Sequence, residues 1–407
     1  MTGRVLIAGV SARGMAESAV RAGYVVIAVD AFADLDLAAI ADTRLVSPYS
    51  ARIAAATARR AAARETDGSL RHNGTMLDAV CYVSNFENHP GALRQLSRGQ
   101  TLWGNAPAAV AAARAPRAWA QALANAGIAV PRVRMSAPKP GTADIRRRWL
   151  LKPKRSGGGH GVQAWRPGMP VPREYVLQER IAGTPGSVVF AADGRNAAII
   201  AITRQLIGEA PLGAPAFRYC GNILAPPDDP EWGDGTPLWH EATAIAAAAS
   251  RAFGLAGVNG IDFIVRGGHP VPIEINPRFT AAMELAERRD GISIFGAHVA
   301  GCTGTLRTGS PLRLPARGVG AAGKAIVFAR HALTVGAAAR TWVSNRDVRD
   351  IPRPGSQIPA GAPICSIFAE ANTATACRTE LIRAARRIYK AVATDVPSSD
   401  AGSRGRR

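Results

Sequence analysis

Residues 259–280, with the sequence NGIDFIVRGGHPVPIEINPRFT, decide the fold. The stretch contains two short runs, 261–265 and 271–276, whose odd-numbered positions are all apolar. Alternation of apolar and other side chains is typical of a β-strand with one buried face. Glycine and proline residues between the runs predict a turn. The sequence therefore predicts an antiparallel hairpin.

Oxygen-bearing side chains occupy the outer face of this hairpin. If the turn centres on Gly268, Asp262 lies opposite Glu274, and Asn276 shares their face. The apolar alternation selects this register, because a one-residue slip would put the carboxylates in the core. Two carboxylates and an amide are the hard oxygen ligands that hold Mg²⁺ on a nucleotide, and Arg278 adds a fixed charge suited to phosphate. The alternative is a solvated polar face.

A glycine-rich stretch, residues 150–162 (LLKPKRSGGGHGV), lies upstream of the hairpin. The predicted strand at its start ends at Pro153, and amides of the following SGGGHG loop can approach an anion closely. The loop is not a P-loop, because Val162 stands where that motif requires lysine. Lys152 and Lys154, two of the chain's five lysines, precede the loop. The alternative is a flexible surface turn.

Together, the two stretches resemble the ATP-grasp superfamily, in which a lysine strand and a glycine-rich lid precede a hairpin ending in Glu-x-Asn-Pro-Arg. The resemblance implies that ATP binds with Mg²⁺, for which Mn²⁺ substitutes, and that Asp262, Glu274 and Asn276 hold the metal. The residues that it assigns to ATP are Lys152, Lys154, Ser156, Gly157, Gly158, Gly159, His160, Gln178, Glu179, Arg180 and Ile181. Within this set, the lid covers the β- and γ-phosphates, and residues 178–181 form the adenine linker.

Three arginines complete the set that the resemblance implies. Arg204 stands where the family often has a cation facing the phosphates, and it is assigned a catalytic role with Arg278. The family usually has an ATP-contacting lysine in the region of the predicted helical stretch 106–127. No lysine precedes Lys139, so Arg117 is the nearest candidate.

The whole chain is expected to have an α/β fold, with α+β character in the grasp. Residues 1–105 open with a βαβ pattern but lack G-x-G-x-x-G, so we expect a Rossmann-like domain without a dinucleotide. Residues 106–305 are expected to form the ATP-grasp domain, with lobes of about 106–180 and 181–305. A small β-rich domain (306–395) and a disordered tail (396–407) are expected to follow.

Two glutamates are substrate candidates. Glu87 follows the third predicted strand, 78–83, where α/β sheets place ligands, and it could bind an amino group. Glu284 lies at the start of a predicted helix beyond the hairpin and could line the substrate pocket. The alternatives are an ordinary polar loop for Glu87 and an exposed helical position for Glu284.

Composition restricts the partners. Fifty Lys and Arg against thirty Asp and Glu give a net charge of +20. The arginines are scattered, aromatic residues are only 6%, and no nucleic-acid-binding motif occurs, which favours a nucleotide and an acidic substrate over nucleic acid. The five cysteines are widely spaced without CxxC, which favours a reduced cytoplasmic compartment. No apolar run suits a signal peptide or a membrane span.

The resemblance to the ATP-grasp superfamily implies an ATP-dependent ligase that joins a carboxylate to an amine through an acylphosphate and releases ADP and phosphate. The chain also resembles ATP-grasp ligases of one-carbon carrier pathways, such as those of methanofuran and methanopterin, which implies glutamate as the acid. The alternatives are a bicarbonate-using carboxylase and a non-catalytic nucleotide- or nucleic-acid-binding protein. A homodimer is expected only by analogy with the fold.

Overall fold

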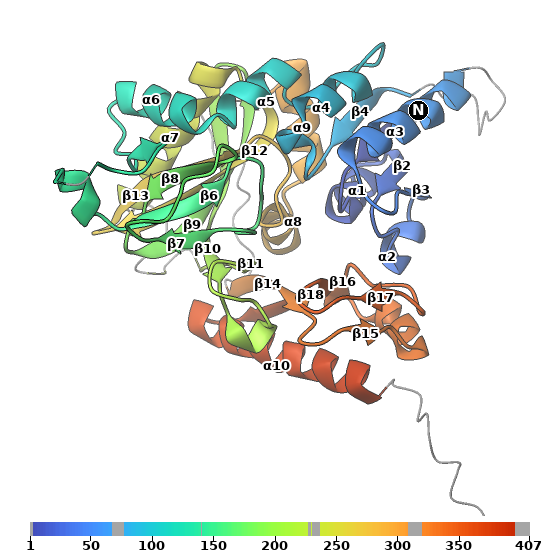
Figure 1. Ribbon diagram of the computed structural model, residues 1–407. Helices are drawn as coiled ribbons and strands as arrows, with labels where there is room; N and C mark the ends of the chain where they lie inside the picture. The colour runs from blue at the N-terminus through green and yellow to red at the C-terminus, as the bar shows by residue number, and fades with distance from the viewer. Residues whose placement is uncertain are drawn as a thin grey trace, which may run out of the picture.

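A parallel sheet opens the chain. The computed structural model describes residues 3–66, 77–139, 141–226, 229, 237–307 and 320–394. The N-terminal strands, in spatial order, are β3 (Asp42–Leu45), β2 (Val25–Asp30), β1 (Arg4–Ala8) and β4 (Ala79–Tyr82). The helices of this region are α1 (Arg13–Arg21), α2 (Leu35–Ala38), α3 (Ala51–Thr66) and α4 (Pro90–Leu96) (Figure 1). The strand β1, which is apolar after Arg4, is buried along its whole length.

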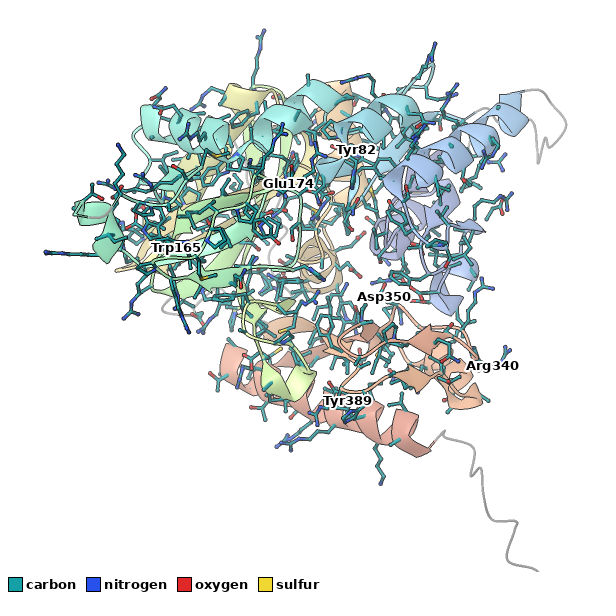
Figure 2. All side chains as sticks on the ribbon, in the orientation of Figure 1. Tyr82, Trp165, Glu174, Arg340, Asp350 and Tyr389 are labelled. Carbon is teal, nitrogen blue, oxygen red and sulfur yellow. The ribbon has the colours of Figure 1, made fainter. Side chains whose placement is uncertain are left out.

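The first lobe of the grasp follows. Its helices are α5 (Pro107–Ala113) and α6 (Pro116–Asn125), where the sequence predicted one helical stretch. Pro116 causes the break, because it disfavours helical geometry at Ala115, which is extended (φ −77°, ψ 114°). A small sheet follows, with the order β5 (Val133–Arg134), β8 (Tyr175–Glu179), β6 (Trp149–Pro153) and β7 (Gln163–Trp165). Figure 2 labels Trp165, which is buried in the core of this lobe.

An eight-stranded sheet forms the second lobe and continues into the C-terminal segment. Its order is β13 (His269–Asn276), β12 (Ala256–Arg266), β9 (Thr184–Asp193), β10 (Ala197–Ile207), β11 (Tyr219–Leu224), β14 (Ala321–Phe328), β18 (Pro363–Ala371) and β16 (Val348–Arg349). The C-terminal segment, predicted as a separate domain, therefore shares the grasp sheet through the pairing of β11 with β14.

The remaining elements cover this sheet or close its ends. They are α7 (Pro237–Phe253), α8 (Met283–Asp290), α9 (Ile294–Thr303), α10 (Ala374–Thr394), β15 (Leu333–Thr334), β17 (Gln357–Ile358) and the short 3₁₀ helices 86–88, 143–146, 210–212 and 337–344. In the described ranges, no helix is both long and apolar enough to cross a membrane. The tail predicted at 396–407 lies outside the described residues.

The predicted hairpin is formed by β12 and β13, and Asp262 pairs with Glu274 as expected. The turn differs from the expectation, because Arg266 pairs with His269 and only Gly267 and Gly268 remain between them. Both glycines have positive φ (60° and 86°), which a tight two-residue turn requires. A one-residue irregularity after Asp262 compensates for the shorter turn. It keeps the two carboxylates opposite each other.

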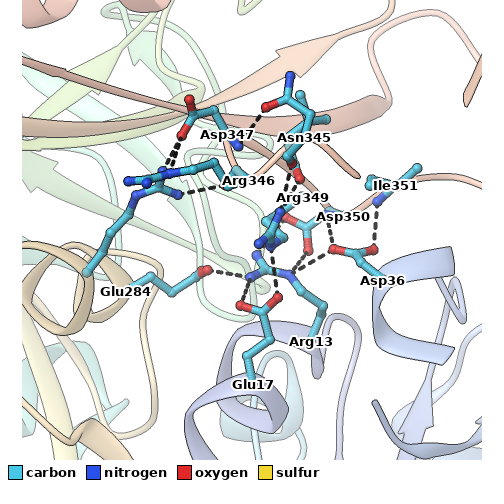
Figure 3. Close-up of polar contacts among 12 residues, drawn as sticks. Arg13, Glu17, Asp36, Glu284, Asn345, Arg346, Asp347, Arg349, Asp350 and Ile351 are labelled. Carbon is cyan, nitrogen blue, oxygen red and sulfur yellow. Dashed lines mark hydrogen bonds and ion pairs between the residues drawn. The ribbon is translucent and has the colours of Figure 1, made fainter. Parts of the chain in front are cut away.

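A buried ion cluster joins the three parts of the chain. Arg13 of α1 binds Glu284 of α8 (2.5 Å) and Asp350, which lies just after β16 (2.9 Å). It also binds Glu17 (3.2 Å), while Asp36 accepts the backbone N–H of Asp350 at 2.8 Å. Figure 3 shows these contacts converging on the Arg13 guanidinium. Because its partners come from three regions, the cluster fixes the N-terminal sheet against the shared sheet.

Asp34→Asn is expected to stabilise the protein at alkaline pH. Burial, with the charges of Asp350, Asp30 and Asp36, raises the pKa of Asp34 to about 8. An acid whose folded-state pKa is raised loses folding stability as the pH rises from 3.8 to about 8, because only the unfolded chain releases the proton. Since one pKa unit corresponds to about 1.4 kcal/mol, urea unfolding should show a gain of up to about 5 kcal/mol at pH 8 and only about 1 kcal/mol near pH 4.5.

Asp42→Asn is the matched control for this variant, because its carboxylate is exposed beside Arg44. It should change the free energy of unfolding by less than about 0.5 kcal/mol at either pH. An equal gain at both pH values for Asp34→Asn would show that ionisation of this carboxyl does not lower the free energy of unfolding.

Candidate functional site

A cavity of about 910 Å³ lies between the N-terminal loops, the two grasp lobes and the start of the C-terminal segment. Its volume is within the usual range for sites that bind small molecules. The predicted residues that line it are Lys152, Lys154, Ser156, Gly157, Gly158, Gly159, His160, Gln178, Glu179, Arg180, Ile181, Asp262, Glu274, Asn276, Arg278, Glu87 and Glu284. Segments separated by nearly two hundred residues thus meet at one site.

Lys152 and Gln178 connect the two lobes across the cavity. Lys152 on β6 donates to the Gln178 side chain at 3.0 Å, and its Nζ lies 3.9 Å from Glu274. The Gln178 amide in turn donates to the Ile273 carbonyl on β13 at 2.9 Å. Burial lowers the pKa of Lys152, although the Glu274 charge opposes the shift. The lysine is therefore a positioned cation at the wall of the cavity.

The glycine-rich lid is fastened at several points. Ser156 Oγ donates to the His160 carbonyl at 2.6 Å, and the Tyr219 N–H donates to the Gly158 carbonyl at 3.0 Å. Gly159 has φ +72°, and a Cβ there would lie 1.8 Å from the Phe217 carbonyl oxygen. A side chain at this position would therefore push the lid away from the loop before β11.

The acidic face of the hairpin forms a compact oxygen cluster. The Asn276 amide donates to Asp262 at 3.0 Å, and Gln205 donates to its other oxygen at 2.8 Å. Burial and the neighbouring Glu274 charge raise the pKa of Asp262 to about 7. Burial also opposes ionisation of Glu274, but Arg114 and Lys152 outweigh it and lower that pKa.

This cluster fits a divalent cation. Its donors are two carboxylates and an amide oxygen, which are hard ligands, and a cation beside them would offset the cost of ionising Asp262. In the part of the chain that the structure describes, no set of three His, Cys, Asp or Glu residues is arranged to hold a metal. The remaining ligands would therefore come from phosphate oxygens and water, as is usual for Mg²⁺.

Arg114 is a site residue that the sequence analysis missed. It forms a close ion pair with Glu274 and donates to Asn88 (3.0 Å) and to the Ser156 carbonyl (2.8 Å). Arg117 does not line the cavity. The break between α5 and α6 at Pro116 places Arg114 at the end of a helix facing the site. The proline, recognised as a helix boundary, was the signal that could have identified it.

Arg204 also lies outside the cavity lining, whereas its neighbour Gln205 lines it and binds Asp262. Side chains on a strand alternate between faces, so residues 204 and 205 of β10 cannot both face the site. A strand assignment alone did not determine which of the two faces inward.

Two glutamates in the cavity wall, Glu87 and Glu284, are paired with basic side chains. Arg278 donates to Glu87 Oε1 at 2.7 Å, and Glu87 is only 2% exposed. Its Oε2 atom is buried and has no hydrogen-bond partner among the described residues. Glu284 is bound by Arg13 and by Lys324. Both glutamates are therefore buried in the wall of the cavity rather than exposed.

The segment predicted to be the adenine linker, residues 178–181, is also held by charged side chains. Glu179, at the end of β8, accepts from Arg147 at 2.6 Å, so its side chain is already engaged. Arg180 stacks over the Phe217 ring at 5.9 Å. These contacts fix the backbone between the lobes, which is the part that a base edge could contact.

Comparison with known proteins finds a family match over part of the chain. Residues 117–282, less than half of the chain, match the family model described as an ATP-grasp domain. This part of the chain is therefore similar to ATP-grasp domains. A search of curated proteins gives no match.

Solved structures resemble the chain over almost its full length. The biotin carboxylase domain dimer of Hydrogenobacter thermophilus 2-oxoglutarate carboxylase, in complex with MgADP, ADP and bicarbonate, has a TM-score of 0.67 at 13% identity, covering 95% of this chain and 90% of that one. N5-carboxyaminoimidazole ribonucleotide synthetase from Thermotoga maritima gives 0.63 at 14%, covering 94% and 98%. L-amino acid ligase from Bacillus licheniformis gives 0.64 at 14%, covering 95% and 97%. At such identities the likeness establishes the fold alone.

Lys152→Ala is expected to weaken nucleotide binding about 10- to 100-fold, because a charge-assisted contact to phosphate contributes about 1.5–3 kcal/mol. Calorimetric titration with MgADP measures the change. Lys139→Ala, which removes an exposed lysine elsewhere in the first lobe, is the control and should leave Kd unchanged. An unaltered Kd for Lys152→Ala would contradict the contact.

Proposed function

We propose that this chain is an ATP-dependent ligase that joins a carboxylate to an amine through an acylphosphate, with release of ADP and phosphate. The observation that carries the proposal is the convergence in one cavity of Lys152, the lid glycines and the acidic pair Asp262 and Glu274. Phosphoryl transfer needs positioned cations and a metal site more than covalent chemistry from the protein. The lining provides both kinds of group.

In this proposal the substrate carboxylate attacks the γ-phosphorus, and the β–γ bridging oxygen leaves with ADP. The amine then attacks the acyl carbon and forms the C–N bond, the acyl C–O bond to the phosphoryl group breaks, and inorganic phosphate leaves with that oxygen and takes up the proton that the amine loses. Mg²⁺, or Mn²⁺ in its place, would neutralise charge on the phosphates from its site at Asp262, Glu274 and Asn276. Lys152 and Arg114 would hold the phosphates, and the lid would exclude water from the mixed anhydride.

The Arg278–Glu87 pair is the proposed acceptor end. Arg278 would steady the carboxylate or the charge developing on the phosphoryl group, while the unpartnered Glu87 Oε2 would accept a hydrogen bond from the amine. The finer assignment that we propose is glutamate as the acid and an amine of a one-carbon carrier cofactor as the acceptor, with two copies of the chain forming the enzyme. The excess of arginine over acidic residues suits such anionic substrates.

A bicarbonate-using carboxylase is the second candidate. Its support is that a solved structure with a similar fold, a biotin carboxylase domain, holds bicarbonate. Bicarbonate would then take the place of the organic acid as the phosphoryl acceptor.

A phosphate-release assay tests these proposals. The full chain with MgATP is given a panel of amino acids and amines, each alone and in pairs, with and without bicarbonate. The ligase predicts ADP and phosphate only when an acid and an amine are both present. Turnover that follows bicarbonate alone would replace the ligase with the carboxylase. ATP binding without turnover under any condition would contradict both enzymes.

A further inference from the structure

Arg114 connects three segments that meet at the main cavity. Its guanidinium forms a close ion pair with Glu274 on β13. It also donates to the Ser156 carbonyl at the start of the lid (2.8 Å) and to the side chain of Asn88 in the loop after β4 (3.0 Å). Only 11% of the Arg114 side chain is exposed. The arginine is therefore a buried junction between the acidic face of the hairpin, the lid and the N-terminal loop.

The carboxylate of Glu274 is already shared between two cations. One of its oxygens contacts Arg114, and the other lies 3.9 Å from Lys152 Nζ. These two cations balance the negative charges of Glu274 and an ionised Asp262. A divalent cation bound through Glu274 would add two positive charges beside a guanidinium in a buried site, where like charges repel strongly. Arg114 and a metal therefore compete for the same carboxylate.

The phosphates of a nucleotide would offer Arg114 another partner. Arg114 lines the cavity, and its Nε atom is buried without a hydrogen-bond partner among the described residues. A guanidinium binds phosphate through several N–H groups at once, so a phosphate oxygen that reached Nε would draw the whole group away from Glu274. A nucleotide–metal complex thus brings both the metal for Glu274 and the replacement partner for Arg114.

The same movement changes how the lid is fastened. The N–H groups of a guanidinium form a rigid planar fork, so Arg114 cannot turn away from Glu274 and keep its present contact with the Ser156 carbonyl. The Ser156 hydroxyl donates to the His160 carbonyl at 2.6 Å, which ties the start of the glycine loop to its end. Release of Ser156 by Arg114 therefore frees the glycine loop as a unit.

We propose that Arg114 is a positioning residue that exchanges Glu274 for the nucleotide phosphates and thereby couples metal binding to the lid. In one state, the arrangement of the structure, it neutralises Glu274, opposes entry of a metal and holds the lid at Ser156. In the other state it binds phosphate, and Glu274 is released to the metal. The metal therefore enters together with the nucleotide rather than before it. This inference rests on the nucleotide and metal site of the proposed function, but not on the identity of the acid or the amine.

Titration with Mn²⁺ alone, followed by electron paramagnetic resonance of the unbound ion, tests the competition. Arg114→Gln is expected to bind Mn²⁺ about 5- to 20-fold more tightly than the unmodified chain, because the repelling charge beside Glu274 is gone. Its Kd for MgADP, measured by calorimetry, should instead rise about 10-fold, because a charge-assisted contact to phosphate is lost. A substitution that only damaged the fold would weaken both.

Two further variants separate charge from geometry. Arg94→Gln removes the same charge from α4, where the side chain is exposed and outside the cavity lining, and should leave both Kd values within about twofold. Arg114→Lys keeps the charge, so it should bind Mn²⁺ alone as weakly as the unmodified chain. It lacks the fork that holds Ser156 and Asn88 together, so the lid should be loosened.

Hydrogen exchange of the lid tests the coupling without any substitution. The N–H groups of His160 and Val162 donate to carbonyls within the lid at 3.2 and 3.3 Å, so their exchange reports opening of the loop. In the unmodified chain, saturating Mn²⁺ should speed this exchange severalfold, because it displaces Arg114, whereas MgADP should slow it. Both variants of Arg114 should exchange faster than the unmodified chain in the absence of metal.

The outcomes distinguish this inference from the proposed function. Equal or weaker binding of Mn²⁺ by Arg114→Gln, or no binding of Mn²⁺ to either chain, would overturn the competition for Glu274. Lid exchange that Mn²⁺ leaves unchanged in the unmodified chain would overturn the coupling. Failure of the unmodified chain to bind MgADP would contradict the proposed function, while the Mn²⁺ comparison would still decide whether Arg114 competes for the carboxylate.

Discussion

Asp262→Asn is expected to lower kcat for magnesium-dependent ATP turnover about 100- to 1,000-fold, because the carboxylate that it removes would hold the Mg²⁺ that offsets the charge developing on the phosphoryl group. The substitution keeps the size of the side chain and its capacity to bind Gln205, so the fold should persist. The loss should appear in kcat and in the Mg²⁺ concentration needed for half-maximal rate. Steady-state kinetics over a range of Mg²⁺ concentrations measure both.

The matched control is Asp193→Asn, at the end of the neighbouring strand β9 and outside the cavity lining. It removes one carboxylate from the same sheet and should leave kcat within about twofold. If Asp262→Asn retained the full rate and the same Mg²⁺ dependence, the metal site would have to lie elsewhere.

The hairpin could be predicted because its information is local. Apolar alternation fixes which face of a strand is buried, and this was enough to place Asp262 opposite Glu274. The turn was predicted wrongly, since two glycines form it and an irregularity after Asp262 restores the pairing. The pairing survived because burial of the apolar face determines the register more strongly than loop length does.

Residues whose role depends on where elements meet were harder to predict. Arg114 faces the site only because Pro116 separates two helices. Gln205 faces it because β10 lies in the same sheet as β12, with β9 between them, and Gln205 is on the sheet face that carries Asp262. Neither orientation follows from the sequence of a single segment, because each depends on how separate elements pack together. The same holds for Arg13, which looks like an ordinary helical arginine until its acidic partners, more than two hundred residues away, are placed around it.

Arg13→Ala is expected to lower the free energy of unfolding by about 3–5 kcal/mol, because it leaves buried carboxylates without their counter-ion. The Arg13 side chain is 1% exposed, and its main partners Glu284 and Asp350 are also largely buried. Burial raises the pKa of both carboxyls and the charge of Arg13 lowers it, so removing Arg13 leaves the cost of ionising them in the folded protein uncompensated. Urea unfolding at pH 7 measures the change.

Arg21→Ala separates this effect from a general loss of helix charge. Arg21 lies on the same helix and pairs with Glu287 at 3.0 Å, but its side chain is 50% exposed, so its removal should cost less than about 1 kcal/mol. Asp350→Asn in the Arg13→Ala background should recover part of the loss, since it removes one of the stranded charges. The recovery would be absent if Arg13 stabilised the junction only through packing of its alkyl stem. A cluster that acts through charge therefore predicts that the double variant is more stable than the sum of the two single changes.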